Sequence, residues 1–211
     1  MAGCVTSTSA SSARAPATRS STTGSTTSSV ALVEMGTFGG TCLNVGCIPS
    51  KMFVHPADLA ASTIQAARLG VDLDLQGVRW REIRDRIFGR IDPKAANGRA
   101  YRYRSHNVTV FDGRARFVGP RELDVGTGRD NYRGPGGHCR GSRPMVPELP
   151  GLSSVDFHTS DTVMRLSELP QSMIIVGGGY VSAEFAHVFS AFGTASHRGE
   201  PIRCATAAGG R

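Results

Sequence analysis

Two cysteines separated by four residues carry the clearest chemical signal in the sequence. Cys42 and Cys47 lie in the segment Gly39–Lys51, behind a Gly-Gly-Thr approach and ahead of Ile-Pro-Ser-Lys. This spacing predicts that both sulfurs lie on one face of an opening helical turn, close enough to form a disulfide. A helix N-terminus and Lys51 would both favour the thiolate, which is the form of cysteine that attacks disulfides. The pattern therefore indicates a redox site.

The cysteine pair has three other interpretations: a structural disulfide, half of a zinc site, or two buried thiols. No second Cys/His pair stands at ligand spacing, and the glycine-rich approach would have no role in any of the three. We therefore favour the redox site and predict no metal site.

A glycine-rich turn between an apolar run and a helical pattern is the second signal. Met173–Val176 predicts a buried strand, which runs through Gly177, Gly178 and Gly179 into a helix. In such a unit the first glycine permits a tight turn, and the next lets the pyrophosphate of a dinucleotide approach the backbone at the helix N-terminus. Ser182 replaces the third glycine, which predicts slightly wider packing of the helix on the strand.

An acidic residue stands at the end of an earlier strand. Val30–Val33 predicts a buried parallel strand, and Glu34 follows it directly. A carboxylate at this position suits the two hydroxyls of a ribose, and the alternative is a solvated charge.

Alternating helices and strands must position these residues. The helical pattern extends from Lys51 to Leu69, with Pro56 near an early turn and Gly70 as its stop. The other predicted elements are an amphipathic helix at Arg79–Phe88, a meander of short strands at Val108–Val110, Ala115–Val118 and Glu122–Val125, a helix that begins at Ser160-Asp161, and a helix from the glycine turn to Gly193.

The charge of the chain is concentrated in three segments. Residues 1–29, 129–140 and 194–211 each contribute +2 of the formal net charge of +7, and the remainder is close to neutral. We therefore predict no nucleic-acid surface. No apolar run approaches the length of a membrane span, so we expect a soluble, cytoplasmic protein.

The segment around the cysteines resembles the active site of the class I flavoprotein disulfide reductases, the pyridine nucleotide-disulfide oxidoreductase family of glutathione reductase and dihydrolipoamide dehydrogenase. The flanking residues, Met35–Phe38 and Met52–Asp58, look most like the members that reduce mycothione. The resemblance implies an α/β fold, with an incomplete FAD-binding Rossmann-like domain and the first βα unit of an NAD(P)-binding domain. It places these at 30–150 and 151–193, between a disordered segment at 1–29 and a disordered tail at 194–211.

The resemblance also implies roles for individual residues. Hydride would pass from NADPH to FAD and then to the Cys42–Cys47 disulfide. Cys47 would hold the thiolate nearer the flavin, and Cys42 would attack a small-molecule disulfide. Catalytic roles would fall to Cys42, Cys47, Lys51 and Glu184, with Lys51 and Glu184 as an ion pair. Cofactor contacts would fall to Glu34, Gly40, Thr41, Lys51, Gly177, Gly179 and Tyr180, the last of which would gate the nicotinamide pocket.

Two segments depart from the family pattern. Residues 1–29 hold sixteen Ser/Thr and lack the glycine turn that contacts FAD, and residues 129–140 lack an apolar strand. The codons possible for 10–29, shifted by two bases, allow Ile-Ile-Gly-Thr-Gly-Ser-Gly-Asn-Ser. Those for 130–140, shifted by one base, allow Thr-Thr-Thr-Ala-Asp-Gln-Val-Val-Ile-Ala-Ala. We therefore hypothesise that both segments are translated out of frame.

The predicted function is that of an FAD-dependent, NADPH-linked reductase of a small disulfide. Mycothione is the predicted substrate. Rival functions within the family are those of dihydrolipoamide dehydrogenase and mercuric reductase. The alternative from another class is a non-functional fragment of a disrupted reductase gene. The resemblance implies a homodimer, but the interface domain and the partner histidine that serves as acid and base have no counterpart in this chain.

Overall fold

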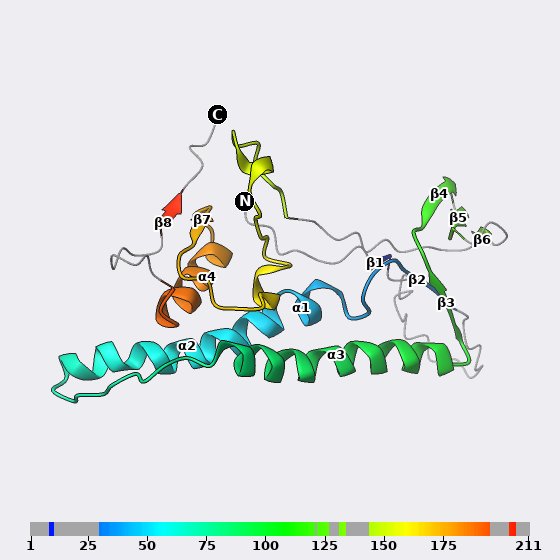
Figure 1. Cartoon of the computed structure of the whole chain (residues 1–211). Helices are drawn as coiled ribbons and strands as arrows, with labels where there is room; N and C mark the ends of the chain where they lie inside the picture. Colours follow the sequence, from blue (N-terminus) through cyan, green and yellow to red (C-terminus); the bar gives the residue numbers. More distant parts are fainter. Residues whose placement is uncertain are drawn as a thin grey trace, which may run out of the picture. The chain divides into compact units, whose positions relative to one another are not determined.

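The computed structural model describes residues 9–10, 30–120, 122–126, 131–133, 144–194 and 203–205. The chain divides into two compact units (Figure 1). Unit 1 is built on Val45–Ile91 and Pro144–Arg211, and unit 2 on Val5–Asn44 and Asp92–Arg143. The boundary falls directly after α1 (Gly40–Asn44), and the long helix α3 (Trp80–Arg104) begins in unit 1 and ends in unit 2.

Unit 2 contains a small sheet of order β1-β2-β3. β2 (Val30–Glu34) and β3 (Val108–Asp112) are parallel and in register, with Glu34 opposite Asp112. β1 (Ser9–Ala10), within the stretch that the sequence predicts to be disordered, pairs antiparallel with the other edge of β2. A second sheet of order β4-β5-β6 is an antiparallel meander of β4 (Arg116–Gly119), β5 (Glu122–Asp124) and β6 (Asn131–Arg133).

The sequence interpretation of the strands was partly wrong. Val108–Val110 belongs to β3 beside β2, not to the meander. A helical crossover lies between β2 and β3, so the second strand returns parallel to the first. The third strand of the meander is β6, with the sequence Asn-Tyr-Arg, which lies inside 129–140, the segment that was expected to lack the apolar strand of the family.

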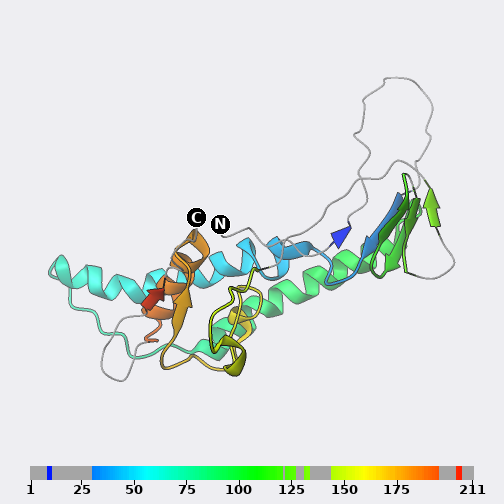
Figure 2. The same ribbon diagram turned by 90° about the horizontal axis from the view of Figure 1, so that it is seen from above.

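Unit 1 is built from helices and one βαβ element. α2 (Cys47–Arg68) and α4 (Tyr180–Ala191) pack together, and β7 (Ile174–Val176) pairs parallel with β8 (Arg203–Ala205) (Figure 2). Two short 3-10 turns, η1 (Leu152–Ser154) and η2 (Val163–Arg165), lie in the segment before β7. β8 falls in the tail that was predicted to be disordered. The predictions for 1–8, 11–29, 129–130, 134–140, 195–202 and 206–211 lie outside the described residues.

An aromatic cluster forms the core of unit 1. The rings of Phe53 on α2 and Trp80 on α3 stack with centroids 5.1 Å apart, and Phe189 on α4 lies 5.6 Å from Trp80. All three side chains are at most 4% exposed. Burial of such large rings is the main force that holds the three helices together. The cluster confirms the apolar face predicted for Arg79–Phe88.

The helix boundaries differ from the predicted ones in two places. α2 begins at Cys47, upstream of Lys51, and Pro56 lies inside it. The helix expected from Ser160 is only the 3-10 turn η2, because the backbone becomes extended at Leu166 (φ −51°, ψ 137°). The Leu166 carbonyl accepts hydrogen bonds from the Trp80 indole at 2.9 Å and the Arg84 guanidinium at 3.0 Å. These side chains satisfy a carbonyl that would otherwise bond within a helix.

β7 was predicted to be buried, and that prediction was wrong. Ile174 is 74% exposed and Val176 41% exposed. In the part of the chain that the structure describes, β8 is the one strand that pairs with β7. The described sheet therefore has two strands, and β7 lies at its edge. None of the described helices is both long and apolar enough to cross a membrane.

Candidate redox and nucleotide site

The two cysteines do not share a helical turn, contrary to the sequence prediction. Cys42 lies within α1 and Cys47 is the first residue of α2. Gly46 interrupts the helix with φ −125° and ψ −126°. Both cysteines are exposed thiols in this structure. Solvent access of the thiols is a requirement of thiol–disulfide exchange.

Asn44 ties the two ends of α1 together. Its side-chain amide donates hydrogen bonds to the carbonyls of Phe38 at 3.1 Å and Gly40 at 2.9 Å. Phe38 lies in the turn before α1 and Gly40 is its first residue, so the amide holds both against the end of the helix. The side chain is 7% exposed, and this structural role was not predicted from the sequence.

Lys51 and Glu184 form the ion pair that the sequence predicted. Lys51 lies one helical turn after Cys47 on α2, and Glu184 lies in the second turn of α4. The Lys51 ammonium donates to Glu184 Oε1. The pair is accessible, with the lysine side chain 62% and the glutamate side chain 30% exposed. Packing of α4 on α2 therefore brings a charged pair to the helix that carries Cys47.

The glycine turn precedes α4 as predicted. Gly177 has φ +132°, a conformation that favours glycine, and a Cβ at this position would lie 3.0 Å from Ser182 Oγ. α4 begins after Gly179 without a side-chain cap. The amides of its first turn are therefore available to an anionic group. Tyr180, at the start of α4, is 57% exposed.

Glu34 is buried at the end of β2. Only 5% of the residue is exposed, and its Oε1 accepts a hydrogen bond from the Gly36 amide at 2.9 Å. Burial raises the pKa of Glu34, while the Gly36 and Met35 amides and the charge of Arg102 oppose the rise. A buried carboxylate at the carboxyl end of a parallel strand is consistent with the predicted ribose contact.

Gly40, Thr41 and Asn44 show whether this segment fits the predicted cofactor, FAD. Gly40 has φ +68°, and Thr41 is 2% exposed. Among the described residues, Thr41 Oγ1 and Asn44 Oδ1 are buried without a hydrogen-bond partner. Such atoms are costly unless a ligand or water satisfies them. The phosphates and hydroxyls of FAD offer suitable partners, so these residues of unit 2 fit the cofactor.

The predicted residues thus fall into two groups. Unit 1 contains Cys47, Lys51, Gly177, Gly179, Tyr180 and Glu184, and unit 2 contains Glu34, Gly40, Thr41 and Cys42. Sequence reasoning missed a second pair between α2 and α4, in which His187 Nε2 lies 2.7 Å from Asp58 Oδ1. Helical spacing puts Asp58 on the face of Lys51 and His187 on that of Glu184, but it does not show that the two helices meet there.

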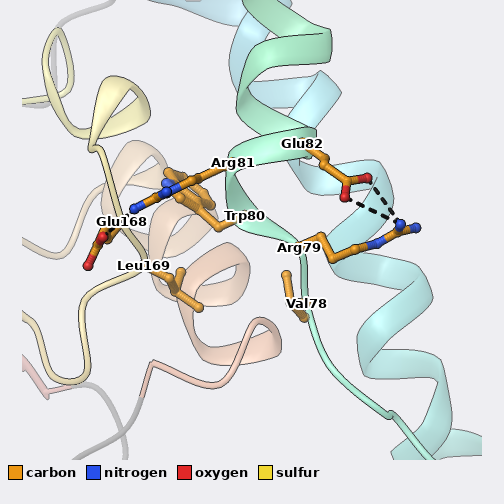
Figure 3. A pocket seen from close by; sticks show the side chains of 7 residues that line it. All are labelled: Val78, Arg79, Trp80, Arg81, Glu82, Glu168 and Leu169. Carbon is orange, nitrogen blue, oxygen red and sulfur yellow. Dashed lines mark hydrogen bonds and ion pairs between the residues drawn. The ribbon is translucent and has the colours of Figure 1, made fainter.

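A shallow pocket in unit 1 does not coincide with these residues. It has a volume of about 340 Å³ at the start of α3 and contains none of the predicted site residues. Ion pairs between Arg79 and Glu82 and between Arg81 and Glu168 lie at its rim (Figure 3). Its lining residues are Val78, Arg79, Trp80, Arg81, Glu82, Glu168 and Leu169.

Comparison with known proteins identifies the class. The family model for pyridine nucleotide-disulphide oxidoreductases matches residues 15–198. The chain belongs to this family, whose members are FAD-binding flavoprotein enzymes. Its α/β organisation is that of a partial flavoprotein disulfide reductase.

The chain is also similar to individual proteins of this family. Mycothione reductase of Mycobacterium tuberculosis is 49% identical over 172 residues, which are 77% of this chain and 37% of that protein. Dihydrolipoyl dehydrogenase of Halobacterium salinarum is 36% identical over 78% of this chain and 35% of its own length. The solved HOCl-induced flavoprotein disulfide reductase RclA of Escherichia coli is 28% identical with a TM-score of 0.62, over 79% of this chain and 35% of that one. The chain thus spans little more than a third of these relatives.

Proposed function

We propose that the protein is an FAD-dependent, NADPH-linked reductase of a small disulfide, with mycothione as the substrate. The observation that carries the proposal is the Lys51–Glu184 pair on the helix that begins with Cys47, in a chain 49% identical to a mycothione reductase. The family acts on small-molecule disulfides.

The chemistry of the cysteines would be thiol–disulfide exchange. The Cys42 thiolate attacks one sulfur of the substrate disulfide, so that a mixed disulfide forms and one thiolate leaves. The Cys47 thiolate then attacks Cys42 Sγ, which closes the Cys42–Cys47 disulfide and releases the second thiolate. Two protons taken up from solvent complete the two product thiols.

FAD, when bound, supplies the electron pair of NADPH to reopen the Cys42–Cys47 disulfide. Glu34, Gly40 and Thr41 would hold it in unit 2. In unit 1, Gly177, Gly179 and the first turn of α4 would bind the NADPH pyrophosphate, and Tyr180 would cover the nicotinamide. Lys51, held by Glu184, would place a positive charge near the flavin. In the intact enzyme a second subunit would supply the acid–base histidine.

The residues also support a more restricted proposal for this chain by itself. The first 29 residues lack a Gly-x-Gly turn, which would otherwise bind the FAD pyrophosphate. We therefore expect the purified chain to be colourless, which would make it a non-functional product of a reductase gene. A yellow protein that NADPH bleaches would contradict this expectation and support activity in the chain itself.

The parent function is tested on the product of the corrected gene. Its NADPH oxidation should be faster with mycothione than with lipoamide or Hg²⁺, and slower with NADH than with NADPH. Cys42→Ser and Cys47→Ser should each abolish turnover, whereas Ser62→Ala, on α2 beyond the motif, serves as the matched control. A preference for lipoamide or Hg²⁺ would support one of the rival functions and contradict the mycothione proposal.

A further inference from the structure

A second polar contact joins α2 to α4 beside the Lys51–Glu184 pair. His187 Nε2 lies 2.7 Å from Asp58 Oδ1. A carboxylate only accepts hydrogen bonds, so Nε2 is the donor. The side chains are 40% and 60% exposed, so this contact adds little to the stability of the fold.

The order of donors and acceptors along the two helices determines which alignment of α4 on α2 allows both pairs to form. α2 presents Lys51 and then Asp58, two turns apart on one face, and α4 presents Glu184 and then His187, one turn apart. Along their shared face, α2 therefore presents a donor and then an acceptor, and α4 presents an acceptor and then a donor. A slide of α4 along α2 that brought Glu184 toward Asp58 would break both pairs and oppose two carboxylates.

The aromatic cluster connects α2 to α4 by way of α3. Phe53 on α2 and Phe189 on α4 each meet the Trp80 ring on α3, at centroid distances of 5.1 and 5.6 Å. Apolar packing of this kind is strong but non-directional, whereas a hydrogen-bonded pair requires a particular alignment of the two helices.

We propose that Asp58 and His187 are positioning residues that hold Glu184 against Lys51. They do so by fixing the register of α4 on α2. The consequence for the flavin, which Lys51 would tune, rests on the proposed function, but the positioning role itself does not.

Zero-length crosslinking with a carbodiimide tests this role in the full chain without flavin or substrate. The reagent activates the Glu184 carboxylate, and the Lys51 amine displaces the activating group to give an amide, while the reagent leaves as a urea that carries the lost water. The chain has two lysines, Lys51 and Lys94. Peptide mass spectrometry can therefore assign the Lys51–Glu184 amide and use the exposed Lys94 peptide as internal reference.

His187→Leu should lower the yield of the Lys51–Glu184 amide at least threefold. His187→Gln, which keeps a donor, and the swapped variant Asp58→His with His187→Asp should each recover at least half of the original yield. His55→Leu, which removes an exposed histidine of the same helix α2, should change nothing. Helicity and the emission of Trp80, the single tryptophan, report whether each variant retains its fold.

An unchanged yield in His187→Leu would overturn the proposal, as would a folded swapped variant whose yield stays low. If His187→Leu does not fold, Asp58→Ala is measured with the same thresholds. Failure of the proposed reductase activity leaves these yields untouched, so the two hypotheses are separable.

Discussion

Glu34 is a buried carboxylate, and a ligand beside it would explain its burial. A carboxylate that is 5% exposed is costly in the protein alone, and the Gly36 and Met35 amides and the charge of Arg102 offset only part of that cost. Under the proposed function, a ribose would provide two further donors. The same reasoning applies to the unpartnered Thr41 hydroxyl.

Glu34→Gln should raise the free energy of unfolding at pH 7 by about 1 kcal/mol, because it removes a buried charge and keeps the acceptor for Gly36. The pKa of Glu34 is raised by burial, so the native state holds the proton to higher pH than the unfolded state. The stability of the parent chain therefore falls, relative to the variant, as pH rises from the ordinary pKa of glutamate through the raised one. Urea unfolding at pH 4 to 7 measures the difference.

Glu82→Gln is the matched control, because the Glu82 side chain is 65% exposed and its ion pair with Arg79 lies on the surface. It should leave the unfolding free energy within about 0.5 kcal/mol at every pH. A Glu34→Gln chain that is less stable than its parent at pH 7 would show that the carboxylate is stabilised within the protein, contrary to our interpretation.

At the scale of elements, α4 joins the two parts of the candidate site in unit 1. Its N-terminus follows the glycine turn, its second turn carries Glu184, and its later turns pack into the aromatic cluster. A change that loosens α4 should therefore weaken the Lys51–Glu184 pair and, under the proposed function, nucleotide binding as well.

Phe189→Ala should destabilise unit 1 by about 3–5 kcal/mol, because the ring is 1% exposed and its removal leaves a cavity beside Trp80. Urea unfolding followed by Trp80 emission measures the loss. Phe157→Ala, at a site 46% exposed, should change the midpoint little. Equal effects of the two substitutions would mean that α4 is not part of a packed core.

Gly89→Ala should stabilise α3 by about 1 kcal/mol, because Gly89 is exposed in the helix interior and a Cβ there meets nothing within 4 Å. Gly98→Ala in the same helix should gain less, since its Cβ would lie 3.2 Å from the Arg102 guanidinium. Thermal unfolding followed by helical circular dichroism compares the two variants, and a larger gain at Gly98 would contradict the prediction.

At the scale of the whole molecule, the family match begins at residue 15 and includes 129–140. The match therefore includes all of 130–140 and the part of 10–29 from residue 15 onward, the two segments for which we predict a shifted frame. If the prediction holds, a glycine turn before β2 and an apolar strand before Gly141 belong to the parent enzyme.

Resequencing of the gene should reveal compensating insertions or deletions around the codons for residues 10–29 and 130–140. The corrected product should bind FAD and turn yellow, whereas the present chain should stay colourless. An unambiguous in-frame reading at both places, together with a relative that shares the Ser/Thr-rich leader, would refute the frame hypothesis.

The local sequence was enough to predict the family and to propose the residues of its site. The spacing of Cys42 and Cys47, the glycines before α4 and the acidic end of β2 are local patterns, and each requires a particular backbone or side chain where it stands. They predicted the family, which the comparisons confirm. Pairing of Lys51 with Glu184 followed from that resemblance, and the structure contains the pair.

Only the tertiary structure decided which distant segments meet. The parallel pairing of β3 with β2, the exposure of β7, the loss of the helix at Ser160 and the contact of Asp58 with His187 all depend on residues far away in the chain. The last two show the reason most clearly. The Leu166 carbonyl takes its hydrogen bonds from Trp80 and Arg84, and Asp58 takes its partner from α4. No local pattern specifies such partners, because hydrogen bonding between distant residues exists only after the helices pack.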